Sequence, residues 1–410
     1  MRGLTGALLS ALAALLALPS CIFFVECVAA LLPRRKRGEP STPVARRDDI
    51  RVAVLVPAHD EEAVISMTLA GIVPELRASD RLLVVADNCS DRTADLARAG
   101  GAEVIVRNDP FQRGKGFALD FGIAHITPHP PDVLVVIDAD CRVERGAIRR
   151  LAEFAMERGR PAQADNLLAV PRAAPPLTSI SALAFLVRNR VRPTGLTRLG
   201  LPCQLMGCGM ALPWKVVEKA PSSGSNLVED MMMGIELAWR GFAPVYCTGA
   251  HVTSPPPKRT QAMRGQRRRW EYGHISTLIH RAPSLIFRGF AERRQELLAM
   301  GLDLLVPPLA LLSMMLAASF LLAFAWSMSG GSPAPLVISS LALGMVGVAV
   351  ISTWLKFGRQ VLPGRYLFAL PFYLVWKVPL YLSFLISGRR RGWERTERLA
   401  RSDSSPTQAR

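Results

Sequence analysis

Short apolar runs alternate with helical patterns in the middle region of the chain. Four runs have the length and β-branched composition of buried strands: IRVAVLVPA, DRLLVVADN, AEVIVRN and DVLVVIDAD. Between them lie EEAVISMTLAGIVPEL, SDRTADLARAGG and GKGFALDFGIAHI, in which apolar residues recur at helical spacing. Strands that alternate with helices are typical of a mostly parallel α/β sheet, which we predict for a cytoplasmic domain at residues 49–291.

A longer apolar run precedes this region. Gly3–Leu32 exceeds the roughly 20 residues that cross a bilayer. A secretory signal has a shorter apolar core, and the lipoprotein-like LPSC that ends at Cys21 is followed by a further apolar stretch. We therefore predict a retained transmembrane helix at residues 1–33. The arginines and lysine that open the basic linker, residues 34–48, place the end of this helix in the cytoplasm.

Three apolar runs lie in the predicted C-terminal membrane region, residues 292–388. Leu302–Trp326 and Pro335–Leu355 are predicted spans, and the uncharged SMSGGSPAP between them is expected to be an external loop. The third run, Tyr366–Ser387, contains two prolines and a lysine, which are costly inside a bilayer. We interpret it as an interfacial or re-entrant segment, with a third span of this region as the alternative. A basic, partly disordered cytoplasmic tail is predicted at residues 389–410.

The composition favours a membrane protein over a nucleic-acid-binding protein. The chain has a net charge of +17, yet half of its residues are hydrophobic. In membrane proteins Lys and Arg collect beside the spans on the cytoplasmic side. A nucleic-acid-binding domain would carry this charge together with a recognisable readout motif, and the sequence has none that we find. We therefore predict the lipid bilayer, and no nucleic acid, as a partner.

Carboxylates follow the predicted strands. In chain order they are Asp60, Glu61, Glu62, Asp87, Asp138 and Asp140. Ligands of parallel α/β sheets bind at this edge, and acids gathered there repel one another unless a cation lies among them. The DxD pair in VIDADC is short and common, but its place directly after VLVVI favours a site for Mg²⁺ or Mn²⁺ that bridges a phosphate.

Two later stretches carry further candidate chemistry. GSNLVEDMMMGIELAWRGF places Glu229 and Asp230 at the start of a predicted helix, where a carboxylate either caps the helix or serves as a general base. RGQRRRWEYGH combines arginines, which suit phosphates, with a glutamine and a tryptophan whose flat face suits a sugar ring. A basic membrane-facing loop would explain the arginines alone.

The ordered set of motifs resembles the family 2 inverting glycosyltransferases of GT-A fold, in their membrane-bound, polysaccharide-synthase-like branch. That branch includes cellulose, hyaluronan and chitin-oligosaccharide synthases and ceramide glucosyltransferase. The motifs, in family order, are VPAHDEE, ADNCSDRT, RGKGFAL, VIDADC, MGCGMAL, LVEDMMMGIELAWRGF and QRRRW. Each is weak alone, but the ordered set is specific and covers roughly residues 52–270.

The resemblance implies a role for each matching residue. Asp230 would be the general base, and Asp138 and Asp140 would hold Mg²⁺ or Mn²⁺. The residues implied to bind the donor nucleotide are Pro57, Ala58, Asp60, Glu61, Asp87, Lys115, Asp138 and Arg269. The residues implied to bind the acceptor are Glu229, Gln266 and Trp270. Asp60 departs from the family pattern, in which Asn is common there, and adds negative charge near a nucleotide.

The implied activity is transfer of a sugar from a UDP-sugar to a lipid-linked or glycan acceptor with inversion, giving a β-linked product. Exopolysaccharide or cell-surface glycan synthesis at the inner membrane, by a multi-pass protein with polysaccharide-assembly partners, is the expected context. The alternatives are a short-oligosaccharide synthase of chitin-like type, a sphingolipid glucosyltransferase and, outside enzymes, a membrane scaffold that binds nucleotide-sugars.

Overall fold

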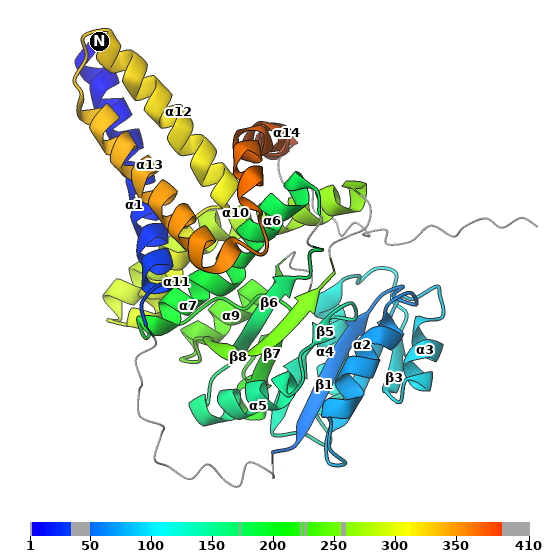
Figure 1. The fold of residues 1–410 in the computed structure, drawn as a ribbon. Helices are drawn as coiled ribbons and strands as arrows, with labels where there is room; N and C mark the ends of the chain where they lie inside the picture. Colours follow the sequence, from blue (N-terminus) through cyan, green and yellow to red (C-terminus); the bar gives the residue numbers. More distant parts are fainter. Residues whose placement is uncertain are drawn as a thin grey trace, which may run out of the picture.

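The structure is a computed structural model that describes residues 2–33, 50–171, 174–221, 224, 228–255 and 260–387 (Figure 1). Side chains at 260–269 and 384–387 are not among the described parts. The predicted linker at 34–48 and tail at 389–410 therefore lie outside the described residues.

An eight-stranded sheet forms the centre of the soluble domain, in the order β3-β2-β1-β4-β7-β6-β8-β5. The strands are β1 (Val52–Ala58), β2 (Arg81–Asp87), β3 (Glu103–Arg107), β4 (Val133–Val136), β5 (Arg142–Val143), β6 (Ala162–Leu168), β7 (Met210–Pro213) and β8 (Val245–Ser254). The four predicted strands are confirmed as β1 to β4, and they pair in parallel. β7 pairs antiparallel with β4 and β6, so the sheet is mostly rather than wholly parallel.

Helices cover both faces of this sheet because alternate residues of its strands point to opposite sides. Val52, Val54 and Val56 of β1 pack with α2 (Ile65–Ile72), α3 (Thr93–Ala99) and α5 (Ala147–Arg158). Ala53 and Leu55 pack on the other side. The helices there are α4 (Lys115–Ile126), α8 (Trp214–Val217) and α9 (Glu229–Trp239).

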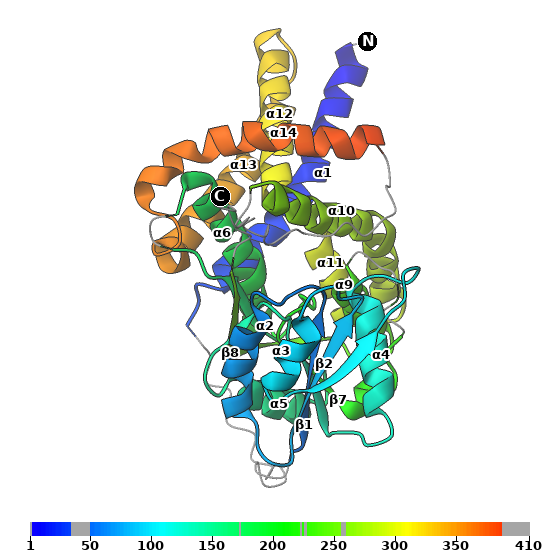
Figure 2. The same ribbon diagram turned by 90° about the vertical axis from the view of Figure 1, so that its right-hand side faces the viewer.

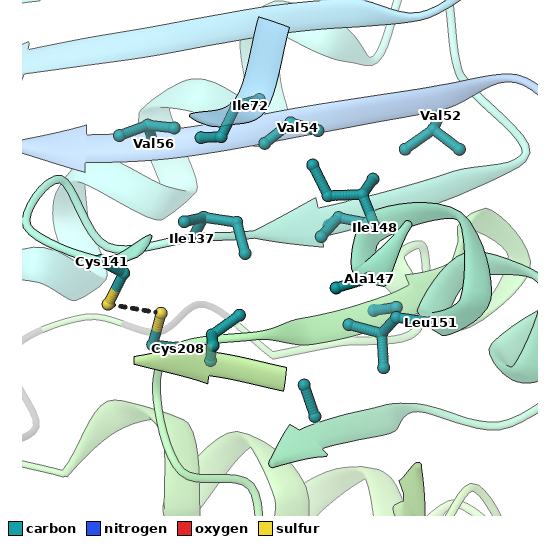
Figure 3. Packing of buried hydrophobic residues seen from close by; sticks show 14 of the residues in the cluster. Val52, Val54, Val56, Ile72, Ile137, Cys141, Ala147, Ile148, Leu151 and Cys208 are labelled. Carbon is teal, nitrogen blue, oxygen red and sulfur yellow. Dashed lines mark hydrogen bonds between the residues drawn. The ribbon is translucent and has the colours of Figure 1, made fainter. Parts of the chain in front are cut away.

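Two cysteines close the first of these cores at its end nearest the carboxyl ends of the parallel strands. The Cys208 thiol donates to Cys141 Sγ at 2.9 Å, beyond Ile137 and the valines of β1 (Figure 3). All seven cysteines are free thiols, and five of them are buried. The base of the candidate site is therefore tightly packed and apolar.

The helices after β6 connect the sheet to the long apolar helices of the chain. They are α6 (Pro176–Leu186), a π-helical turn η2 (Val187–Val191), α7 (Arg192–Arg198), α10 (Thr260–Ala291) and α11 (Gln295–Leu305). α1 (Arg2–Ala29), α12 (Leu309–Met328) and α13 (Ala334–Thr353) form a bundle that projects away from the sheet (Figure 1). α1, α12 and the helix that continues from α13 to Gly358 are long and apolar enough to cross a membrane.

The predicted span at Leu302–Trp326 is wrong at its beginning. α11 ends at Leu305, and the apolar span begins only at Leu309 as α12. Pro307 and Pro308 separate the two helices, because proline has no backbone N–H to donate within a helix.

α14 (Leu370–Ser387) runs crosswise to the bundle of α1, α12 and α13 (Figure 2). The segment Gly364–Ser383 has the length and hydropathy of a fourth candidate span. Phe372 and Val375 are largely exposed on it, whereas Lys377 is buried and pairs with Glu271 of α10. The lysine thus faces the protein, whereas Phe372 and Val375 face outward.

A buried ion network holds the bundle to the soluble domain. Arg192 at the start of α7 donates to Glu26 of α1 at 2.5 Å and to the Asp303 carboxylate of α11 at 2.6 Å. The helices also approach closely at Gly195, where an added Cβ would lie 1.9 Å from the Glu26 carbonyl oxygen. α1 is therefore fixed to the helices that lead to the site.

Candidate active site

Lys115 supplies the cation that the acids at the strand ends require. It is the first residue of α4, and its ammonium donates to the Asp138 carboxylate and, at 2.8 Å, to the Gly207 carbonyl. Burial opposes its charge, but the Asp138 and Glu229 carboxylates more than compensate and raise the pKa of Lys115. The lysine is therefore a permanent positive charge between the end of β4 and the start of α9.

Glu229 and Asp230 begin α9 beside this lysine. Burial, and then repulsion from Asp230, raise the pKa of Glu229 to about 7, although Lys115 opposes the shift. Burial also raises the pKa of Asp230, against the opposing effects of Lys115 and Arg188. The N-cap residue is Val228, and α9 begins without a side-chain capping bond. The two half-buried carboxylates thus form a pair that holds a proton more tightly than exposed acids do.

Gly207 allows Asp230 and Lys115 to face each other. Its φ angle is +85°, which favours glycine. A Cβ added there would lie 3.0 Å from Asp230 Oδ2 and 3.4 Å from Lys115 Nζ. The first glycine of MGCGMAL, Gly207, therefore provides both the required backbone conformation and room for two charged side chains.

The predicted nucleotide-binding residues lie at the ends of β1 and β2. Pro57 is half-buried, while the side chain of Ala58 packs in the core. Asp60 has a φ of 51° and accepts from the Ser90 N–H at 2.6 Å. The Glu61 N–H donates to Thr93 Oγ1 at 2.7 Å. These bonds fix the loop after β1 against the loop after β2.

Asp87, expected to contact the base, already has a cationic partner. Arg107 at the end of β3 donates to it at 2.7 Å, and both side chains are buried. Asn88 also donates to the same oxygen at 3.0 Å. Arg107 was not singled out from the sequence, although it ends a predicted strand next to the one that ends in Asp87. The ion pair therefore orients the Asp87 carboxylate at the edge of the sheet.

Asp138 and Asp140 are the residues that fit a divalent cation. Both are half-buried, and their carboxylate oxygens are the ligands that Mg²⁺ and Mn²⁺ prefer. The thiols of Cys141 and Cys208 lie within 4.8 Å of Asp138 as well. They are softer ligands, and the hydrogen bond with Cys208 together with burial raises the pKa of the Cys141 thiol. The carboxylates, rather than these thiols, suit a hard cation.

A cavity of about 120 Å³ lies among α1, α6, η2, α10, α12 and α14. Trp270 of α10 lies on its wall, with its ring centroid 5.7 Å from that of Phe185. Gln266 and Arg269 belong to the same helix, but their side chains lie outside the described residues. So do the side chains of Arg267 and Arg268.

Among the described residues, the structure brings together Lys115, Asp138, Glu229 and Asp230, with Asp140 following Asp138 in the same loop. Arg188 was not singled out from the sequence. It lines the cavity, and its charge opposes the rise in the pKa of Asp230. Three arginines in RNRVR at residues 188–192 were the only signal for it, and sequence does not distinguish their partners.

Comparison with known proteins agrees with this geometry. Residues 50–273 match the family described as "Glycosyltransferase like family 2". The chain is 28% identical over 234 residues to "Probable glycosyltransferase YdaM" of Bacillus subtilis, which covers 55% of each chain. It is 30% identical over 196 residues to "Uncharacterized glycosyltransferase Rv0539" of Mycobacterium tuberculosis, which covers 42% of this chain and 85% of that protein. The chain thus spans about half the length of YdaM.

The whole architecture also resembles a solved structure. The mannosyltransferase PcManGT from Pyrobaculum calidifontis, solved in complex with GDP-Man and Mn²⁺, superposes with a TM-score of 0.55 and covers 93% of this chain and 100% of its own. The identity is 16%, so this likeness concerns the fold.

Proposed function

The chain belongs to the family 2-like glycosyltransferases, and from this premise we propose that it transfers a sugar from a UDP-sugar to a lipid-linked or glycan acceptor with inversion. The observation that carries the proposal is the position of Asp230. Its carboxylate lies with the Lys115 ammonium beside Gly207, and Arg188, which lines the neighbouring cavity, acts on it electrostatically. A base between a donor site and an acceptor cavity is what a single displacement requires.

In the proposed reaction Asp230 takes the proton of an acceptor hydroxyl as that oxygen attacks the anomeric carbon. The bond from this carbon to the diphosphate breaks as the new bond forms on the opposite face, so an α-linked donor gives a β-linked product. The raised pKa of Asp230 suits a base that must accept a proton and release it again near neutrality. Glu229 lies beside the base, and Trp270 would support the acceptor sugar.

The donor would lie along the ends of β1, β2 and β4. Pro57, Ala58, Asp60, Glu61 and Asp87 would line the nucleotide pocket, with Lys115 and Arg269 beside the diphosphate. Mg²⁺ or Mn²⁺ held by Asp138 and Asp140 would neutralise charge on the departing diphosphate. The complex of PcManGT with GDP-Man and Mn²⁺ supports this part of the proposal by analogy.

The proposed setting is the inner membrane, with the sheet domain in the cytoplasm. Three apolar helices would cross the bilayer, and the crosswise α14 would lie at its interface, with Phe372 and Val375 toward the lipid. One sugar would be added at the cytoplasmic face to a growing exopolysaccharide or cell-surface glycan on a lipid carrier. Polysaccharide-assembly proteins would then process the product.

The test is nucleotide release by the full chain in nanodiscs. A panel of UDP-sugars and GDP-mannose would be supplied with Mg²⁺ or Mn²⁺, with and without total membrane lipid. We expect release from one UDP-sugar that depends on added lipid and yields a lipid-bound product. Release without lipid, with a soluble oligosaccharide, would favour the short-chain synthase, and a glycosylated sphingolipid would favour the glucosyltransferase. Nucleotide binding without release from any donor would support the scaffold.

A further inference from the structure

Three arginines stand at alternate positions on η2 and the start of α7. Two of them have acid partners. Arg190 pairs with Asp165, and Arg192 pairs with Glu26 and Asp303. Arg188 has no hydrogen bond or ion pair with any group that the structure describes, although it is partly buried. Burial lowers the pKa of Arg188, and the charges of Asp230, Asp303 and Glu271 oppose this shift without a hydrogen bond to the guanidinium. An arginine held in this way is a cation prepared for an anion.

The cavity of about 120 Å³ is where this guanidinium lies. Other ionisable groups on the cavity wall, among them Glu271 and His274, each have a partner, although Oε2 of Glu271 has no hydrogen-bond partner among the described groups. Glu271 pairs with Lys377, and His274 shares a hydrogen bond with the Val306 carbonyl oxygen at 3.1 Å. Burial, together with Arg188 and Arg192, lowers the pKa of His274 to about 3, so the imidazole is neutral at physiological pH. Arg188 is therefore the cavity cation without a close counter-charge among the described groups.

Most of the rest of the wall is apolar, and part of it comes from the candidate membrane helices. Phe23 comes from α1, Leu309 from α12 and Tyr373 from α14, while Phe185 comes from α6. A free inorganic anion would gain nothing from these side chains, whereas an amphipathic molecule would bury its apolar part against them. The volume suits a head group and the start of a chain, with the remainder of the chain in the bilayer.

We infer that Arg188 binds a phosphate group of the acceptor lipid, at the point where its apolar tail meets its head. This inference rests on the proposed function and specifies its acceptor class as an anionic, phosphate-bearing lipid. The tail would extend past Phe23 and Leu309 into the bilayer, and the sugar or hydroxyl beyond the phosphate would reach Trp270 and Asp230. Guanidinium binds phosphate through two parallel N–H donors, which also orients the head group.

Binding can be tested without transfer. The full chain in phosphatidylcholine nanodiscs would be titrated with farnesyl phosphate, with farnesol and with inorganic phosphate. We expect farnesyl phosphate to bind about tenfold or more tightly than farnesol, because the guanidinium–phosphate pair is a charge-assisted, two-donor hydrogen bond. Arg188→Gln should remove this preference and leave farnesol binding unchanged, whereas Arg188→Lys should retain part of it. Arg359→Gln, which changes an exposed arginine after α13, is the matched control.

Each outcome decides the inference. Equal binding of the phosphate and the alcohol by the unmodified chain, or a preference that survives in Arg188→Gln, would overturn it. Competition by inorganic phosphate with the same affinity would assign the site to a free anion. An unchanged thermal transition in Arg188→Gln would show that the variant folds. Transfer to a neutral lipid alone would refute the phosphate site and leave the glycosyltransferase proposal intact. Phosphate-dependent binding without transfer would support the phosphate site and refute the glycosyltransferase proposal.

Discussion

Lys115 and Asp138 form a direct ion pair at the carboxyl end of β4, and this pair links the two halves of the candidate site. On one side, Asp138 belongs to the DxD segment that suits a divalent cation. On the other, the same ammonium approaches Asp230 across Gly207. One lysine thus lies between acids from two distant parts of the chain and offsets part of their mutual repulsion.

Gly207→Ala is expected to reduce transfer by about tenfold or more while the chain still folds. The new methyl group would press on Asp230 and Lys115, and the positive φ adds strain of about 1–3 kcal/mol. Gly200→Ala is a matched control, because Gly200 has a φ of +76° and an added Cβ there would meet nothing within 4 Å. Rates and thermal transitions of both variants should be compared. Equal loss of activity in the two would attribute the effect to strain alone.

Glu229→Gln is expected to change how stability depends on pH. The pKa of Glu229 rises from 4.5 to about 7 on folding, so the folded chain holds this proton more tightly than the unfolded chain. The unmodified chain should therefore lose free energy of unfolding relative to Glu229→Gln as pH rises from 4.5 to about 7, by on the order of 3 kcal/mol. Thermal unfolding across this range measures the difference. Exposed Glu157→Gln is the control, and parallel curves for Glu229→Gln and the unmodified chain would contradict the account.

The strand-end acids were accessible from sequence because both their strands and their spacing are local patterns. β1 to β4 appear as apolar runs, and the carboxyl ends of parallel strands meet at one edge. The helix start at Glu229 was likewise predicted correctly. For these parts of the site, local pattern and tertiary structure agree.

The partners of these residues could not be predicted, since they depend on tertiary contacts. Nothing in RNRVR distinguishes Arg188, which has no ion pair among the described groups, from Arg192, which has two. The ion pair of Asp87 with Arg107 joins neighbouring strands whose order only the fold defines. The break between α11 and α12 is different, because Pro307 and Pro308 were a readable signal for it.

Arg192→Met is expected to destabilise the chain by about 3–5 kcal/mol, because it leaves Glu26 and Asp303 buried without their shared cation. Thermal unfolding in detergent should show a large downward shift. The compensated variant, with Glu26→Gln and Asp303→Asn added, should recover part of the loss. A shift no larger than that of exposed Arg359→Met would show that the network does not hold α1 to the soluble domain.

Asp140→Asn is expected to raise the concentration of Mn²⁺ or Mg²⁺ that gives half-maximal transfer by about tenfold or more, because an oxygen ligand of a hard cation loses its charge. A chelator should abolish transfer by the unmodified chain, and added Mn²⁺ should restore it. Exposed Asp95→Asn should behave as the unmodified chain does. Transfer that persists in chelator would remove the metal from the account.

The central claim is that Asp230 is the base, and Asp230→Asn tests it most directly. Sugar transfer and nucleotide affinity should be measured on the same preparation in nanodiscs, because the substitution removes the proton acceptor but keeps the side chain's shape. We predict that transfer falls by about 10²–10⁴-fold, while nucleotide binding and the thermal transition stay close to those of the unmodified chain. Substantial transfer by Asp230→Asn would contradict the assignment.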